Sequence, residues 1–528
     1  MHDIALVLGL LAVVAGLVSL ANRLSIPYPI LLVIGGLLLG FIPNRVLPDI
    51  VLEPDLLLLL FLPPLLYWDA LHTSWRDFRA NLRPIAALAF GLVIVTTVGV
   101  ALVAHGVLGL PWPVSFVLGA VVSATDAVAA GSIMARLGVP RRVVVILEGE
   151  SLINDATALV IYASAVGVVV HGSFSLVDTS LHFIGAGVGG VAAGLIVGAV
   201  VLRLRQHIAD SRVEGMVSLL TPFAAYLPAD LLGASGVLAA VAAGLYMGRR
   251  SPLALAPATR LQADAIWELG AFVINGLTFI LVGFQLHPIV LALSGRSFPT
   301  LLGDAAAVSV TVVVVRIAWV FPGAHLAVVR GRLGGRDPRL PSRAELGILA
   351  WAGLRGAIAL ATALALPERT AHGPFPDRDL ILFLTFSVIL VTLVGQGLSL
   401  APLIRWLGVA EDDTLAREER QARQAVTRAA LTRLKIWAAR EGVSPELIED
   451  LRVHYERRAA RFDGAGDEEE ALEEHAATVQ AVQRDLLDAE RQTLVALRDR
   501  NVIGDAVLRR VQRDLDLDDV RLGEVDVH

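Results

Sequence analysis

The side chains most able to do chemistry gather in residues 147–160, which hold three carboxylates together with hydroxyl and amide groups. This segment lies within an apolar run from about residue 143 to residue 170, and about 20 apolar residues are enough to cross a bilayer. Asp155 lies about 12 residues into the run, so at about 1.5 Å per residue it should be near mid-membrane. Ionisable groups at that depth cost roughly 3 kcal/mol or more to insert and usually mark an ion or proton path.

Helical spacing sorts these side chains onto two neighbouring faces. Ser151 and Asp155 are four residues apart and share one face. Glu150 and Asn154 are also four apart and form the next stripe, about 100° round the axis. One helix would thus present a carboxylate with a hydroxyl beside a carboxylate with an amide. The alternative is a polar seam that only holds helices together.

The composition is that of a membrane protein with many spans. Of the 528 residues 55 % are hydrophobic, and the mean hydropathy is +0.67. The chain has no cysteine, which excludes disulfides, thiolate metal sites and a cysteine nucleophile. Its lysine, Lys435, lies outside the apolar region, so no intramembrane lysine can carry a proton.

The apolar runs predict an all-α polytopic fold. We expect about 13 transmembrane helices, near residues 3–21, 28–43, 51–68, 84–106, 113–135, 143–170, 182–202, 213–228, 232–248, 264–287, 301–321, 344–366 and 379–408. With the N terminus outside, most loop arginines fall on the cytoplasmic side, as the positive-inside rule requires. The first run has no basic leader and no obvious cleavage site, so we interpret it as a span.

Several spans carry interruptions or charges. The third contains Pro63-Pro64 and should be bent or broken, the fifth contains Thr125-Asp126, and the eleventh contains Arg316. The twelfth contains Arg355 between Gly353-Leu354 and Gly356. The fifth and twelfth spans are seven apart and therefore cross in opposite directions. That offset is typical of two inverted six-helix repeats with discontinuous crossing helices and one connecting span.

The character of the chain changes after about residue 410. Residues 1–410 form the predicted transmembrane exchanger domain, and residues 411–528 form a predicted soluble tail. Helices are expected near 414–440, 445–462, 468–500 and 505–515. The tail is acidic and shows no nucleotide or phosphate motif, so we interpret it as a cytoplasmic regulatory or dimer-supporting module. We expect no nucleic-acid partner. Which ligand or protein, if any, binds the tail is left open.

Charges inside a membrane need partners. Asp126 and Asp155 are acids at similar depth on consecutive spans, and Glu150 is a third. Arg316 and Arg355 are the candidate counter-charges. Two close carboxylates cannot both ionise freely, whereas a cation between them favours their charged forms. A proton and a cation would therefore compete for the same groups, and this competition is the basis of an antiporter.

Three motifs together resemble a known family: Thr125-Asp126, Glu150-Ser151-Leu152-Ile153-Asn154-Asp155, and Gly353-Leu354-Arg355-Gly356-Ala357. They are similar to the signatures of the monovalent cation:proton antiporters, the sodium/proton exchangers, here of bacterial type with a cytoplasmic tail. The resemblance covers about residues 1–410. It implies a secondary active antiporter, not an enzyme, that exchanges protons for sodium across the cell membrane by alternating access.

The resemblance also implies roles for residues. Asp155 would carry the cation and the proton, and Asp126, Ser151 and the backbone near Thr125 would complete an oxygen shell for sodium, potassium or lithium. Glu150 and Arg316 would form a buried pair with Asn154 beside it, and Arg355 would hold the broken twelfth span. The family works as a homodimer with a mobile core and needs no cofactor. Asn154 stands where electrogenic relatives have a second Asp, and Arg316 stands where they have a titratable lysine. Neither residue can release a second proton, so the resemblance implies one proton per cation.

Other interpretations remain open at this stage. Thr125 could merely bond its own helix backbone, Arg355 could be a clamp on carbonyl groups, and Glu148 could be a helix-start residue facing the cytoplasm. A potassium-selective exchanger would need the same ligands. An intramembrane aspartyl protease also uses two Asp residues, but its Gly-x-Gly-Asp and Tyr-Asp patterns are absent here. A cation channel would need a filter of carbonyl-rich loops, for which we find no pattern.

Overall fold

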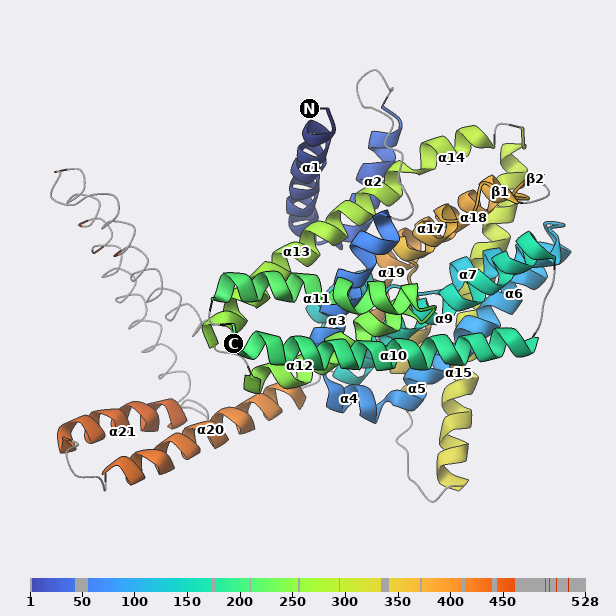
Figure 1. The fold of residues 1–528 in the computed structure, drawn as a ribbon. Helices are drawn as coiled ribbons and strands as arrows, with labels where there is room; N and C mark the ends of the chain where they lie inside the picture. The colour runs from blue at the N-terminus through green and yellow to red at the C-terminus, as the bar shows by residue number, and fades with distance from the viewer. Residues whose placement is uncertain are drawn as a thin grey trace. The chain divides into compact units, whose positions relative to one another are not determined.

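The computed structural model describes residues 2–42, 56–172, 176–208, 210–254, 257–293, 295–333, 341–370, 373–409, 414–438 and 444–460, with isolated positions at 490, 493, 500 and 511. The chain divides into two compact units, residues 1–412 and 413–528. Apart from one two-residue hairpin, the regular structure in the described part is helical (Figure 1).

The helices of the first unit are α1 His2–Leu24, α2 Tyr28–Gly40, α3 Leu62–His72, α4 Trp75–Ala80, α5 Leu82–Ala86, α6 Val93–Gly106, α7 Trp112–Ser123, α8 Ala127–Arg136, α9 Arg141–His171, α10 Leu176–Gln206, α11 Ser211–Leu231, α12 Gly236–Ala254, α13 Pro257–Phe284, α14 Leu286–Ala292, α15 Phe298–Leu333, α16 Arg343–Trp351, α17 Ala357–Leu364, α18 Arg378–Leu390 and α19 Gly397–Leu407. Three π-helical segments precede or continue them: η1 Leu56–Phe61, η2 Ala87–Leu92 and η3 Val391–Gln396. Strands β1 Arg369–Thr370 and β2 Gly373–Pro374 pair antiparallel, with Arg369 opposite Pro374.

Eight helical segments among the described residues are long and apolar enough to cross a membrane. They are Val7–Leu24, Leu82–Gly106, Trp112–Met134, Arg141–His171, Thr179–Arg205, Arg260–Ala292, Phe298–Gly323 and Arg378–Leu407. Each overlaps a predicted span, and the shorter apolar helix Tyr28–Gly40 overlaps another. The chain is therefore a polytopic helical membrane protein, as predicted. The total of 13 spans and the inverted repeats stay predictions.

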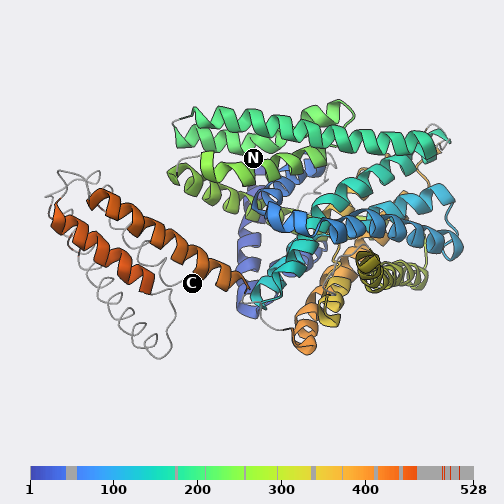
Figure 2. The same cartoon turned by 90° about the horizontal axis from the view of Figure 1, so that it is seen from below.

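The helices of the first unit pack as two sets. Helices α1–α3 pack with α10–α13, and α5–α9 pack with α15–α19. Within the first set α10 and α12 run side by side (Figures 1 and 2). Gly194 makes this approach possible, because a Cβ there would overlap the carbonyl of Ala239 on α12. Helix α3 packs against both α12 and α9 and so connects the two sets.

Prolines mark the third predicted span as expected. Pro63 and Pro64 occupy the first turn of α3, directly after the π-helical segment η1. The first turn of a helix tolerates proline because its N–H groups lack intrahelical partners anyway. A change from π-helical to α-helical backbone falls at the prolines, while the predicted bend or break of this span stays a prediction.

In the second unit, α20 Thr414–Ala438 and α21 Pro445–Ala460 pack against each other. They agree within two residues with the first two predicted tail helices. The other two predicted helices, near 468–500 and 505–515, lie outside the described residues apart from the isolated positions. The tail's role stays a prediction.

Candidate functional site

Two helices are broken where the sequence predicts interruptions. Helix α7 ends at Ser123 and α8 begins at Ala127, with extended backbone at Ala124 and Asp126 between them. Helix α16 ends at Trp351 and α17 begins at Ala357. Each break leaves backbone N–H and C=O groups that a membrane cannot hydrate, so these groups need partners within the protein.

The two breaks supply partners to each other. The Asp126 N–H donates to the Leu354 carbonyl at 2.8 Å, and Arg355 Nε donates to the Val122 carbonyl at 3.1 Å. Arg355 Nη1 also donates to the Gly353 carbonyl, and the Arg355 N–H donates to Thr392 Oγ1 at 3.1 Å. Every acceptor of the Arg355 side chain found here is a backbone carbonyl, which is the contact pattern of a clamp.

Helix α9, which carries the central motif, holds the first break from the other side. Asn154 Nδ2 donates to Thr125 Oγ1 at 2.7 Å and to the Thr125 carbonyl at 3.1 Å. Ser151 Oγ donates to the same carbonyl at 3.1 Å. Thr125 Oγ1 in turn donates to Glu150 Oε1 at 3.0 Å. The alternative in which Thr125 bonds only its own backbone is therefore wrong, since its hydroxyl joins two helices.

Asp155 and Asp126 differ in burial and in their hydrogen-bond partners. Asp155 is 1 % exposed, and within the described part of the chain neither of its carboxylate oxygens has a hydrogen-bond partner. Asp126 Oδ1 caps α8 by accepting the Val128 N–H at 2.8 Å, and its Oδ2 lies against Gly356. A buried carboxylate without partners is very costly to keep charged. A nearby cation compensates the charge, and a bound proton removes it. The orphaned oxygens of Asp155 therefore fit an ion-carrying site.

Asp69 on α3 is a third carboxylate at this place, and the sequence analysis missed it. Its charge interacts with Asp126 and with Asp155, and α3 packs on α9, with Leu66 and Leu152 in one buried apolar cluster. The Asp69 side chain is exposed, Asp126 is half-buried and Asp155 is buried, so exposure falls along the series. In the sequence, Asp69 stood out only as an acid one residue beyond the predicted end of the third span.

Glu148 lies in the second turn of α9 and is half-buried. Its charge also interacts with Asp69 and with Arg141. Glu148 is thus the eighth residue of α9, and its expected position at a cytoplasmic helix start stays a prediction. Across the described residues, no three His, Cys, Asp or Glu side chains converge closely enough to hold a metal ion by themselves. A cation at Asp155 would need hydroxyl or carbonyl oxygens as well.

Glu150 and Arg316 lie together as a bidentate pair between α9 and α15. Arg316 Nη1 and Nη2 donate to Glu150 Oε1 and Oε2 at 2.5 and 2.9 Å, and the two side chains are 1 % and 2 % exposed. Arg316 Nε donates to the Leu349 carbonyl at 3.1 Å. The pair thus connects the central helix to α15 and to α16 before its break.

Two glycines beside Arg355 make room for this arrangement. A Cβ on Gly353 would overlap the side chain of Arg316, and a Cβ on Gly356 would overlap Oδ2 of Asp126. The sequence predicted an interruption from these small residues but gave no reason for their positions. Each glycine admits one charged side chain into the second break.

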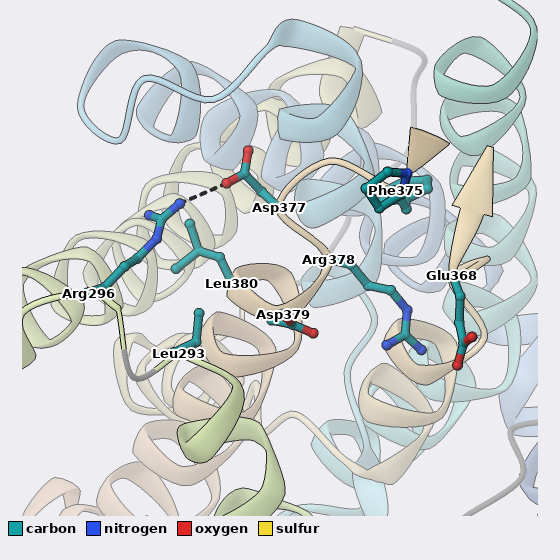
Figure 3. Close-up of a pocket in the computed structure, with 9 residues that line it drawn as sticks. Leu293, Arg296, Glu368, Phe375, Asp377, Arg378, Asp379 and Leu380 are labelled. Carbon is teal, nitrogen blue, oxygen red and sulfur yellow. Dashed lines mark hydrogen bonds and ion pairs between the residues drawn. The ribbon is translucent and has the colours of Figure 1, made fainter. Parts of the chain in front are cut away.

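A pocket in the described part of the chain lies elsewhere. It has a volume of about 440 Å³ between the α14–α15 loop and the segment that joins β2 to α18 (Figure 3). Arg296 donates to Asp377 across it at 2.8 Å, and Arg378 donates to the carbonyls of Leu364 and Leu366. None of the predicted site residues lines it. Asp155, whose buried oxygens have no partner among the described residues, lies outside this pocket.

The fold is that of a polytopic helical membrane protein in which two broken helices meet beside buried carboxylates. A family model described as "Sodium/hydrogen exchanger, transmembrane" matches residues 9–406. The chain belongs to the sodium/hydrogen exchanger family, as its motifs predicted.

Individual relatives agree with this assignment. An uncharacterised Na⁺/H⁺ exchanger of Mycobacterium tuberculosis is 41 % identical over 522 residues, which cover 97 % of this chain and 94 % of the relative. A sodium, potassium, lithium and rubidium/H⁺ antiporter of Bacillus pumilus is 33 % identical over 472 residues, covering 85 % and 68 %. The solved sodium proton antiporter MjNhaP1 of Methanocaldococcus jannaschii has a similar fold, with a TM-score of 0.59 at 21 % identity over 76 % of this chain and 98 % of that one. These relatives are transporters and not enzymes.

Proposed function

We propose that the protein is a secondary active antiporter in which Asp155 carries a monovalent cation in one direction and a proton in the other. The observation that carries this proposal is the buried Asp155 carboxylate, both of whose oxygens lack a partner among the described residues. Asp126 is the second site carboxylate. A cation stabilises the charged forms of both groups, whereas a proton neutralises one of them, so the two ligands exclude each other.

The cation's oxygen shell is completed by neutral groups. Ser151 Oγ lies one helical turn from Asp155 on the same face and is hydrogen-bonded to the Thr125 carbonyl at 3.1 Å. Hydroxyl, carbonyl and carboxylate oxygens are hard ligands that suit sodium, lithium and potassium. Sodium is the expected substrate, and the name of the Bacillus pumilus relative supports testing potassium and lithium beside it.

The exchange is electroneutral in this proposal. Asn154 cannot ionise, and Arg316 is held in a bidentate pair with Glu150. Asp126 and Asp155 then share one proton, which leaves when one cation binds. No cofactor takes part. The protein acts as a homodimer in the cell membrane, with its N terminus outside and its C terminus in the cytoplasm, and the site opens to the two sides alternately.

The test is sodium-, potassium- or lithium-driven proton movement in proteoliposomes, measured separately for each cation. Asp155→Asn should abolish exchange while the protein still inserts and folds. Asp304→Asn is the matched control, because Asp304 lies half-buried in the membrane helix α15 and outside the site. Full exchange by the Asp155→Asn protein would end this mechanism.

A further inference from the structure

A group of exposed arginines lies on the short helix α4 and the start of α5. Arg76 and Arg79 are three residues apart on α4 and share one face, and Arg83 follows in α5. All three residues are exposed, and the side chain of Arg76 is 79 % exposed. Trp75, the first residue of α4, is 37 % exposed and stacks on the buried ring of Phe78 at 6.1 Å. Helix α4 therefore presents guanidinium groups and an indole ring to its surroundings.

The first turn of α9 adds two more arginines to this surface. Arg141 Nη2 lies 2.8 Å from Asp77 Oδ2, and Arg142 Nε donates to Asn81 Oδ1 at 3.3 Å. Helices α4 and α5 both pack against α9. Asp77 is the single acid in residues 74–86 and 141–142. The arginines that gather here are called the basic patch, which consists of Arg76, Arg79, Arg83, Arg141 and Arg142.

The basic patch lies where two membrane-spanning segments begin. One apolar segment starts at Leu82, directly after Asn81, and another starts at Arg141. The hydrogen bond from Arg142 to Asn81 joins the two starts, so both lie at the same level. Lipid headgroups lie at the ends of membrane spans, and tryptophan is enriched there. Arginines just outside a span attract anionic lipids. The patch is therefore within reach of the headgroups.

We propose that the basic patch binds the headgroups of anionic phospholipids, for which phosphatidylglycerol is the test case, and that this binding holds α4 against the start of α9. The argument is charge complementarity. Five guanidinium groups lie with one carboxylate, so they repel each other unless further anions lie among them. A lipid phosphate accepts charge-assisted hydrogen bonds from guanidinium groups. Its acyl chains would enter the bilayer beside Trp75.

Two contacts carry the effect of bound lipid to the central helix. The Arg141–Asp77 ion pair and the Arg142–Asn81 hydrogen bond connect α4 to the first turn of α9. Without anionic lipid, the repulsion among the arginines works against both contacts. Because α9 also carries Asp155, we expect exchange to be faster when the patch is occupied. This second step rests on the proposed function, whereas the binding of lipid does not.

The first test is quenching of tryptophan fluorescence in the full-length protein in mild detergent. Brominated phosphatidylglycerol is the probe, and brominated phosphatidylcholine is the comparison without net charge. The quenching that disappears in Trp75→Phe reports Trp75 itself. Half-saturation of this quenching should occur at a lower concentration of phosphatidylglycerol than of phosphatidylcholine.

The double variant Arg76→Gln with Arg79→Gln tests the patch. Its half-saturating phosphatidylglycerol concentration should rise about tenfold to thirtyfold, since each arginine near a membrane surface contributes about fivefold. Its melting temperature should stay close to that of the wild type, because both residues are exposed. The control is Arg249→Gln with Arg250→Gln, which removes two exposed arginines of α12 on the same side of the predicted topology. This control should bind as the wild type does.

The variant Asp77→Asn separates binding from its effect on α9. It removes the charge that pairs with Arg141 but keeps all five arginines, so quenching of Trp75 by phosphatidylglycerol should be retained. Wild-type exchange should be about twofold to fivefold faster in vesicles that contain phosphatidylglycerol than in phosphatidylcholine alone, the range that one partly exposed ion pair supports. In Asp77→Asn this dependence on the lipid should be much smaller.

Equal quenching of Trp75 by the two lipids, or an unchanged half-saturation in the double arginine variant, would overturn the lipid site. Displacement of phosphatidylglycerol by soluble glycerol phosphate would show a phosphate site that needs no lipid. Absence of quenching at Trp75 would show that another part of the chain covers the patch, and either result would also overturn the proposal.

The effect on exchange has its own refutation. Equal exchange rates of the wild type in the two kinds of vesicle would overturn the second step. A wild-type protein that moves no protons with sodium, potassium or lithium, but whose Trp75 is still quenched selectively, would refute the proposed function and leave the lipid site in place. The two failures are therefore distinguishable.

Discussion

The Glu150–Arg316 pair gives a prediction whose size can be worked out from the contacts. Glu150 accepts three hydrogen bonds, two from Arg316 and one from Thr125, and Arg316 donates its Nε–H to the Leu349 carbonyl. In Glu150→Gln the guanidinium loses its charged partner, and in Arg316→Gln the carboxylate keeps only the Thr125 hydroxyl. Breaking one side of such a buried pair costs about 3–5 kcal/mol.

The double variant separates pairing from packing. If the two residues were independent, their losses would add to about 6–10 kcal/mol. With both charges removed, no ion is left buried alone, and the two amides can bond each other. The double variant should therefore lose no more than one single variant does, about 3–5 kcal/mol or less.

The assay is thermal unfolding in detergent at one fixed scan rate, followed by tryptophan fluorescence. Each single substitution should lower the melting temperature by on the order of 5–10 °C, and the double substitution by no more. Arg296 and Asp377 provide the control, since they form a pair of 2.8 Å whose side chains are 41 % and 27 % exposed. An exposed pair is worth about 0–1 kcal/mol, so its variants should change little. Additive losses at Glu150 and Arg316 would refute the reasoning.

Gly356→Ala should lower exchange on the order of a hundredfold by displacing Asp126, whereas Gly303→Ala, which meets open space, should not; normal exchange by the first would show that the contact is unimportant. Asp69→Asn should raise the half-saturating sodium concentration and leave folding intact, and unchanged sodium dependence would remove Asp69 from the site. Sodium-driven proton flux should not respond to an imposed potential, because a one-for-one cycle moves no net charge. One net charge moved against 100 mV is worth about 2.3 kcal/mol, so a several-fold response would exclude one-for-one exchange. Deletion of the tail after about Asp413 should preserve folding and exchange but shift the pH dependence, and a truncated protein that fails to insert would contradict this.

Local sequence rules predicted the helix breaks and the central helix. Polar and small residues inside apolar runs are rare, so Thr125-Asp126 and the glycines beside Arg355 were visible without any three-dimensional information. Helical spacing also placed Ser151 on the same face as Asp155. These features depend on neighbours within one or two turns, and short-range patterns encode them well.

Features that depend on distant segments were not predictable in the same way. Asp69 comes near Asp126 and Asp155 because α3 packs on α9, and nothing within four residues of it signals that packing. The positive-inside rule counts arginines without their partners, so it could not show that Arg205 is buried in a pair with Glu214. The positions of Gly353 and Gly356 follow from the side chains of Arg316 and Asp126, which other helices supply.

The hydrogen bonds between the two broken helices have a consequence for biosynthesis. Arg355 and the Val122 carbonyl that it binds are separated by 233 positions, and the Asp126 N–H likewise waits for the Leu354 carbonyl. A ribosome must make all of the intervening chain before either bond can form. Until then an open break at residues 124–126 would expose backbone polar groups to lipid, at several kcal/mol each. The junction between α7 and α8 therefore reaches its final shape only after α16 and α17 have been inserted, so the contact between the two breaks is completed late in assembly.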